Sequence, residues 1–253
     1  RSVEVNAKGS EQTTLSEQAP VPGSHVRLTI DAEMQSALEK ALENNLKKIR
    51  KQRAAAIALD SNTGAVLALV SLPAYNNNDF AGGIAADKYQ SYITDPNQPL
   101  FNRGIAGEYP SGSTIKPALA VGALAEGVIN GKSAIASVGG IRVGNWFFPD
   151  WLAGGHGLTD VRKSLAWSVN TFYYYIGGGY GSFSGLGIDG LQTILGKFGF
   201  GRPLGIDMPG EAAGFIPSPE WKKKKKGEQW SIGDTYNLSI GQGDLLVTPL
   251  QIA

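Results

Sequence analysis

The hydrophobic pattern divides the start of the chain into a polar segment, a short strand and an amphipathic helix. Residues 1–24 are mostly polar and include two prolines and two glycines, which is typical of a linker or of the tail of a preceding domain. Apolar and polar residues alternate over 26–30, and this predicts a strand. After Asp31, a potential cap, apolar residues recur every three or four positions and predict a helix with one buried stripe, formed by Met34, Leu38, Leu42, Leu46 and Ile49.

A β-hairpin is predicted next. Two apolar runs over 54–60 and 65–71 flank a turn with an asparagine and a glycine, as expected for two strands that pair directly. Residues 73–112 are rich in proline, glycine, asparagine and aspartate, and they predict surface loops with one short helix near 87–93.

Helices and loops dominate the predicted second half. The alanine- and leucine-rich stretch over 113–126 ends on Gly127, which predicts a helix with a glycine stop. Thr159 is placed to cap another helix that continues through Trp167. An apolar segment over 171–176 and an amphipathic helix over 188–198 follow, whereas we expect irregular structure over 128–158, a glycine-rich loop over 177–187, and loops with short strands over 199–247.

This order of elements favours an α+β fold, an antiparallel sheet flanked by helices, over alternating β-α-β units. A hairpin alone is only marginally stable in water, and the rest of the chain predicts few long strands. The chain also begins without a methionine and closes, over 248–253, on what reads as the first turn of a helix. We therefore expect a fragment at both ends, with an incomplete sheet, a linker or tail over 1–24 and a partial domain over 25–253.

Composition removes several classes of function. The chain has no cysteine, which excludes disulfides, thiol catalysis and cysteine-bound zinc. The two histidines, His25 and His156, lie far apart and outside any recognisable signature, so we expect no metal, no cofactor and no Ser-His-Asp triad. A net charge of +1 gives no global field that would attract nucleic acid. No stretch approaches the roughly 20 apolar residues of a membrane span, and no signal peptide is visible.

Ser113 and Lys116 form the first candidate for chemistry. A serine hydroxyl is a poor nucleophile at neutral pH and requires a base, and a lysine whose pKa is lowered by burial can supply one. A spacing of three on a helix places both side chains on one face, and the helix N-terminus offers N–H groups for a developing oxyanion. A serine three residues before a lysine is common by chance, so this box alone is weak.

Ser168 and Asn170, at a break in the helical pattern, form the second candidate. Ser168 can pass a proton, and Asn170 can hold a substrate amide through its carbonyl and NH₂ groups. Serine and asparagine are also frequent at turns and helix ends, so this pair alone favours a structural explanation. The two pairs in this order, however, match the Ser-x-x-Lys and Ser-x-Asn boxes of serine β-lactamases and penicillin-binding proteins.

The chain resembles the class B penicillin-binding proteins, and most closely the penicillin-binding protein 2 type that acts in side-wall elongation. The resemblance extends along nearly the whole chain and depends on no single box. Besides the two boxes it rests on Leu28-Thr29-Ile30-Asp31, Ala58-Leu59-Asp60, Thr63-Gly64-Ala65-Val66-Leu67-Ala68, Asn102-Arg103, Tyr109-Pro110-Ser111-Gly112, Gly155-His156-Gly157, Phe198-Gly199, Gly205-Ile206-Asp207, Gly241-Gln242-Gly243 and Thr248-Pro249-Leu250-Gln251.

The resemblance implies the transpeptidase fold of penicillin-binding proteins and the activity of a peptidoglycan DD-transpeptidase. Ser113 would attack the D-Ala-D-Ala end of a stem peptide, Lys116 would activate it, Ser168 would relay protons and Asn170 would orient the acyl amide. β-Lactam antibiotics would acylate Ser113 as substrate mimics. The resemblance also implies a site on the extracytoplasmic face of the cell membrane, a membrane anchor upstream of Arg1, and partners from the elongation machinery.

One part of the family pattern has no counterpart in these 253 residues. The third box of the family, Lys-Thr-Gly, is not found, and Lys132-Ser133-Ala134 lacks the glycine and lies between the first two boxes. In the family this box binds the substrate carboxylate, and its strand supplies an oxyanion N–H, so we expect the 253-residue chain to acylate poorly. Gly241, Gln242 and Gly243 predict a tight turn near the site, and we assign them to substrate binding.

Two alternatives remain open. A carboxypeptidase or β-lactamase-type hydrolase on the same fold would need an activated water, and no carboxylate in the sequence identifies itself for that role. A non-catalytic penicillin-binding scaffold or sensor domain would keep the fold without using Ser113. The five lysines over 222–226 favour a solvated loop, with attraction to anionic wall polymer or lipid headgroups as the functional alternative.

Overall fold

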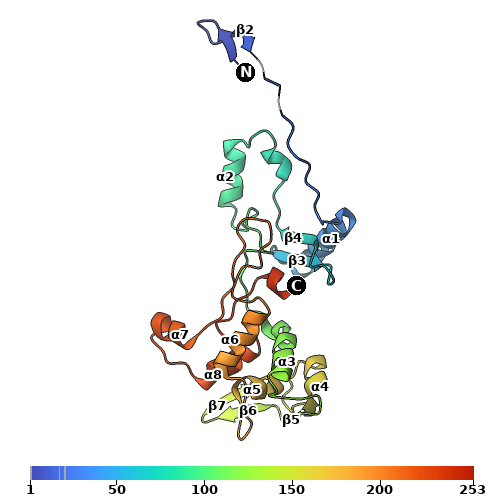
Figure 1. The fold of residues 1–253 in the computed structure, drawn as a ribbon, viewed down its shortest axis with the longest axis vertical. Helices are drawn as coiled ribbons and strands as arrows, with labels where there is room; N and C mark the ends of the chain where they lie inside the picture. The colour runs from blue at the N-terminus through green and yellow to red at the C-terminus, as the bar shows by residue number, and fades with distance from the viewer. Residues whose placement is uncertain (1, 17, 20) are drawn as a thin grey trace.

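The computed structural model describes residues 2–16, 18–19 and 21–253. At the start of the chain, β1 (Ser2–Val5) pairs with β2 (Glu11–Ser16) in an antiparallel hairpin. This hairpin lies apart from the other elements, most of which form two groups joined by loops (Figure 1).

The first group packs a helix on a hairpin. The α-helix α1 (Ala32–Ile49) begins where Asp31 Oδ1 accepts the Met34 N–H at 2.9 Å. The strands β3 (Ala54–Leu59) and β4 (Val66–Leu72) pair antiparallel. The predicted helix and hairpin are thus both confirmed, but the buried stripe is shorter than predicted, because Met34 and Ile49 near the helix ends are exposed. An apolar cluster joins the helix to the hairpin and contains Leu38, Leu42, Leu46, Ala54, Val70 and Leu72.

The prediction of a strand over 26–30 is wrong. The segment makes isolated hydrogen bonds with β4 rather than a ladder of backbone pairs: Thr29 Oγ1 donates to Val66 O at 2.7 Å, and the N–H of Asp31, the next residue, donates to Leu67 O at 2.9 Å. Its side chains are almost all exposed, so the alternation of apolar residues does not mark a buried face here.

The loops predicted over 73–112 are present, and the short helix predicted near 87–93 is α2 (Ala86–Thr94). A 3-10 helix that was not predicted, η1 (Asn77–Phe80), precedes it. The helix predicted over 113–126 is present, but it starts with a 3-10 turn, η2 (Gly112–Ile115), before the α-helix α3 (Lys116–Ala125). Gly127 follows in the left-handed region at φ +71°, which agrees with the predicted glycine stop.

Four short strands replace the irregular structure predicted over 128–158. The strand β5 (Ala134–Ser137) pairs antiparallel with β8 (Gly157–Asp160), and β6 (Gly140–Val143) pairs antiparallel with β7 (Trp146–Pro149). Each strand has only four residues, which is too short for a period of two to be recognised among the glycines.

The helix α4 (Val161–Ala166) is capped by Asp160, whose side chain accepts the Lys163 N–H. The predicted cap, Thr159, lies in β8 instead, because the strand continues up to Asp160. The next two helices agree with the apolar and amphipathic segments predicted for them: they are α5 (Asn170–Gly178) and α6 (Gly187–Lys197).

Two helices also replace the loops and short strands predicted over 199–247, namely α7 (Pro219–Lys226) and α8 (Ile232–Ser239). The lysine run therefore lies on a helix and not in a solvated loop. Ser218 caps this helix through the Trp221 N–H, and Gly227 ends it in the left-handed region.

Acidic partners neutralise both ends of the lysine run. Lys222 is buried, and its Nζ lies 2.8 Å from Asp234 and 3.3 Å from Glu228. Lys226 pairs with Asp244 at 2.7 Å. The run is therefore partly structural, because it ties α7 to α8 and to the loop that follows α8.

The core of the second group surrounds α5. Its residues Phe172, Tyr173 and Ile176 are fully buried and pack against apolar side chains of η2, α3, α6 and α8, among them Ile115, Leu119, Leu191, Leu195 and Leu238. The helical turn predicted at the end of the chain is α9 (Pro249–Ile252). It lies against β3 of the first group (Figure 1). The fold is α+β as predicted, and within the described residues every sheet has two antiparallel strands.

Candidate active site

Ser113 is exposed on η2, directly after Gly112, whose φ of +54° lies in the left-handed region. The turn is held by its own hydrogen bonds: Thr114 Oγ1 donates to Ser111 O at 2.6 Å, and the Lys116 N–H donates to Ser113 O. The Ser113 hydroxyl is therefore presented to solvent from a fixed turn.

Lys116, three residues later, is only 2% exposed. Its Nζ donates to Asn170 Oδ1 at 2.7 Å, to Ser168 O at 2.8 Å and to Ser168 Oγ at 3.1 Å. An ammonium group has three N–H donors, so each one has an acceptor. The structure thus brings Lys116, Ser168 and Asn170 together, and it places Ser113 on the turn that leads into Lys116 without a bond between their side chains.

The environment of Lys116 lowers its pKa from 10.5 to about 8. Burial is the cause, because it disfavours the charged form, and the negative charge of Asp150 opposes the shift. The ring of Tyr173 also faces the ammonium, with its centroid 5.1 Å from Nζ. A lysine with a pKa near the working pH can accept and return a proton.

Ser168 has a φ of +52°, which residues other than glycine, asparagine and aspartate rarely adopt. This backbone lets both Ser168 O and Ser168 Oγ reach Lys116 Nζ. Val169 follows with no exposed surface and fixes the segment in the core, and Asn170 is the first residue of α5.

Asp150, which the sequence did not single out, lies behind this cluster and is 6% exposed. Its carboxylate accepts the Asn170 N–H at 2.8 Å, the Thr171 N–H at 3.1 Å and the Ser137 hydroxyl at 3.0 Å. Burial acts to raise the Asp150 pKa, but the hydrogen bonds from Thr171, Asn170 and Ser137 outweigh it and lower the pKa. The one signal in the sequence is that Asp150 is the only acidic residue between 128 and 158.

The side chain of His156 is buried beside this carboxylate, with Nδ1 3.8 Å from Asp150 Oδ2. Its ring contacts the rings of Trp151 and Trp167 edge-on, at centroid distances of 4.9 Å and 6.3 Å. Within the described ranges, no three histidine, aspartate or glutamate side chains come together as a metal would need.

The predicted turn over 241–243 touches the backbone that precedes Ser113. The Gly112 N–H donates to Gly241 O at 2.8 Å. Gly241 and Gly243 have φ values of +72° and +76°, which explains the need for glycine at both. The turn therefore contacts the Ser113 turn and is not part of the hydrogen-bonded Lys116 cluster.

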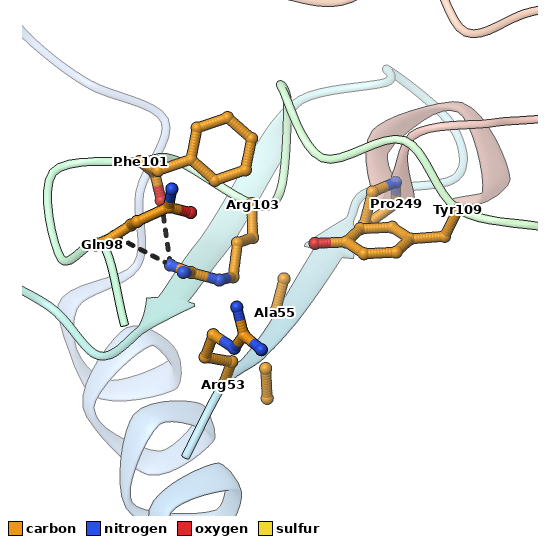
Figure 2. Close-up of a pocket in the computed structure, with 8 residues that line it drawn as sticks. Arg53, Ala55, Gln98, Phe101, Arg103, Tyr109 and Pro249 are labelled. Atoms are coloured by element: carbon orange, nitrogen blue, oxygen red, sulfur yellow. Dashed lines mark hydrogen bonds between the residues drawn. The ribbon is translucent and has the colours of Figure 1, made fainter. Parts of the chain in front are cut away.

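A separate cavity of about 490 Å³ lies next to β3, where the start of that strand faces the loop over 98–109 and the first residue of α9 (Figure 2). The guanidinium of Arg103 faces it but is already held by the backbone carbonyls of Asn97, Gln98 and Phe101. None of Ser113, Lys116, Ser168 and Asn170 lines this cavity, so it is distinct from the candidate site. Its lining consists of Arg53, Ala54, Ala55, Gln98, Phe101, Arg103, Tyr109 and Pro249.

Comparison with known proteins gives a consistent result. The model of the penicillin binding protein transpeptidase domain matches residues 54–253. Peptidoglycan D,D-transpeptidase MrdA of Escherichia coli K12 is 39% identical over 258 residues, which cover 99% of this chain and 38% of that protein. The chain thus spans well under half the length of this curated relative.

Comparison with solved structures gives the same result. The crystal structure of Pseudomonas aeruginosa PBP2 in complex with WCK 5153 aligns with a TM-score of 0.79 and 36% identity, over 92% of this chain and 50% of that chain. Helicobacter pylori PBP2, in a complex with MreC, aligns with a TM-score of 0.80 and 35% identity, over 99% of this chain and 45% of that chain. In the described part of this chain, no helix is long and apolar enough to cross a membrane.

Proposed function

The chain belongs to the penicillin-binding protein transpeptidase family, and from this membership we propose that it carries the acyl-transfer site of a peptidoglycan DD-transpeptidase of the penicillin-binding protein 2 type. The folded domain in this proposal is 25–253, and 1–24 is a linker or the tail of a preceding domain. The observation that carries the proposal is the buried Lys116, whose ammonium is bound by Ser168 and Asn170 beside the Ser113 turn.

In the first step, Ser113 Oγ attacks the carbonyl carbon of the penultimate D-Ala, and the hydroxyl proton passes to neutral Lys116. A pKa of about 8 leaves roughly a quarter of Lys116 neutral at pH 7.5. Ser168 Oγ, 3.1 Å from Nζ, then relays the proton to the amine nitrogen of the terminal D-Ala as the C–N bond breaks. An acyl ester on Ser113 and free D-Ala result.

In the second step, an amino group of a neighbouring stem peptide attacks the ester carbonyl. It loses its proton to the lysine and serine pair, the bond from the acyl carbon to Ser113 Oγ breaks, and Oγ regains the proton. Asn170 Oδ1 is occupied by Lys116, so the NH₂ group of Asn170 is the part that orients the acyl amide. The turn of Gly241, Gln242 and Gly243 contributes to substrate binding from the side of the Ser113 turn.

The test is intact-mass measurement after incubation with a penicillin, on the protein at its natural length and on the 253-residue chain. We expect one penicilloyl adduct that Ser113→Ala abolishes, and slower acylation of the 253-residue chain, whose sequence contains no Lys-Thr-Gly box. An adduct that persists in Ser113→Ala would refute the assignment of the nucleophile. Equal acylation rates for the two lengths would refute the expectation for the shorter chain.

The lifetime of the adduct distinguishes the transpeptidase from a hydrolase. A hydrolase needs a carboxylate that is able to activate water, and Asp150, the buried carboxylate behind the Lys116 cluster, is occupied by the N–H groups of α5 and by Ser137. We therefore expect a long-lived adduct, and rapid turnover would favour the hydrolase.

We also propose where the protein acts and which proteins it binds. The substrate is peptidoglycan, so the site faces the extracytoplasmic side of the cell membrane, with an anchor outside the 253 residues. The complex of Helicobacter pylori PBP2 with MreC supports a partner from the elongation machinery. Pull-down of the natural-length protein from a membrane extract, with MreC detected by antibody, checks this, and no enrichment over a tag-only control would argue against it.

A further inference from the structure

We propose that Asp150 is a positioning residue for the cluster of Lys116, Ser168 and Asn170, acting through the first turn of α5 and through its negative charge. This inference rests on the proposed acyl-transfer function and adds to it a residue outside the two sequence boxes.

The first turn of α5 depends on Asp150 because the helix has no cap of its own. The residue in the cap position, Val169, is apolar, and no side-chain cap bond is formed there. The first N–H groups of a helix lack partners within the helix, and a carboxylate is a favourable partner for this positive end. Asp150 supplies it from the end of β7, with one oxygen for Asn170 and the other for Thr171.

This bond determines where the Asn170 side chain points. The backbone of Asn170 is fixed by Asp150 at 2.8 Å, and its side-chain oxygen meets Lys116 Nζ at 2.7 Å. Lys116 in turn holds Ser168 through two atoms. If the first turn of α5 moved, the Asn170 side chain would move with it. Lys116 would then lose the position of a hydrogen-bond acceptor, and the substrate would lose the amide that orients it.

The charge of Asp150 acts on the same cluster, because it favours the protonated form of Lys116 and so raises its pKa. The other titratable groups that face the pair are Tyr173, over Lys116, and Tyr174 and His156, near Asp150. Burial, together with Asp150, raises the pKa of Tyr174 to about 12, so Tyr174 stays neutral over the working range. Asp150 therefore keeps the proton on Lys116 more firmly than burial alone would.

The test compares Asp150→Asn and Asp150→Glu with Asp160→Asn, all at natural length. Asp160 is the matched control, because its side chain also accepts a helix N–H, at 2.8 Å in α4. The measurement is the rate of acylation by a labelled penicillin from pH 6 to 9, alongside thermal unfolding. For Asp150→Asn we expect a rate at the pH optimum roughly tenfold lower or more, and an acid limb at lower pH because the Lys116 pKa falls. For Asp150→Glu we expect a lower rate with the acid limb at its wild-type position.

A wild-type acid limb in folded Asp150→Asn, or an equal loss of rate in Asp160→Asn, would overturn the proposal. If Asp150→Asn does not fold, Asp150→Glu decides, and a wild-type rate in that variant overturns the positioning role. Failure of wild-type protein to acylate at Ser113 would instead reject the proposed function, so the two failures are distinguishable.

Discussion

Replacing Gly241 with alanine tests whether the 241–243 turn holds the Ser113 turn in place. A Cβ on Gly241 would lie 2.0 Å from Gly112 O and 2.4 Å from Ser111 Oγ, where real Cβ atoms essentially never come closer than 3.0 Å. The carbonyl belongs to the backbone and cannot rotate away as a side chain can. The two turns must therefore separate by about 1 Å, and the Ser113 turn moves with them.

The chain provides a matched control in Gly227→Ala. Gly227, at the end of α7, has nearly the same backbone conformation, with φ +71° against +72°, but its added Cβ would meet nothing within 4 Å. Both variants have the cost of a left-handed alanine, about 1–2 kcal/mol. Only Gly241→Ala displaces the nucleophile, and a displacement of about 1 Å at a reacting group costs on the order of 100-fold in rate.

The assay is the second-order rate of acylation by a fluorescent penicillin, with thermal unfolding of both variants measured in parallel. We expect Gly241→Ala to lose about 100-fold in this rate and Gly227→Ala to stay close to wild type, although both unfold at lower temperature. Equal acylation rates in the two variants would refute the reasoning, because they would show that the contact with Gly112 does not position Ser113.

Other predictions concern packing and titration. Gly122→Ala places a Cβ 2.4 Å from Ile194 and should destabilise the fold by about 1–3 kcal/mol in denaturant unfolding, whereas the Cβ of Gly131→Ala meets nothing within 4 Å and should have little effect. Phe172→Ala, at a fully buried position, should cost about 3–5 kcal/mol, and a loss below 1 kcal/mol would contradict the core assignment. Burial lowers the pKa of Lys116 from 10.5 to about 8, so between these pH values the unfolded chain binds more protons than the folded chain. The free energy of unfolding should therefore rise between pH 8 and 10, relative to that of Lys116→Met. Parallel curves of unfolding free energy against pH for the two proteins would contradict the lowered pKa.

Elements with complete local signals could be predicted from the sequence. The helix α1 has an N-terminal cap and an apolar stripe, and β3 and β4 have a turn between two apolar runs. The helix α7 had such signals as well, since Ser218 and Pro219 precede the lysines and Gly227 follows them. The run of like charge obscured these signals, although acidic partners such as Asp234 neutralise part of it in the fold.

The candidate site could be predicted only in part. Ser113 and Lys116 share one turn, so their proximity follows from spacing alone. The bond from Lys116 to Ser168 spans 52 residues, and only the order of the two boxes suggested it. Asp150 has no local pattern that marks it as an acceptor for Asn170, 20 residues later. A carboxylate that caps a helix from a separate strand is a tertiary feature, which periodicity does not encode.

Burial of Lys116 makes the proposed chemistry depend on the packing of α5. A charged lysine that is only 2% exposed is costly unless its donors are satisfied, and all three acceptors lie in Ser168, just before α5, and Asn170, its first residue. Phe172 and Tyr173 hold that helix in the core. A core change that admits water to Lys116 lets its pKa return toward 10.5, and each unit lowers the neutral fraction about tenfold at neutral pH. Acylation at pH 7 should therefore report loosening of α5 before thermal unfolding does.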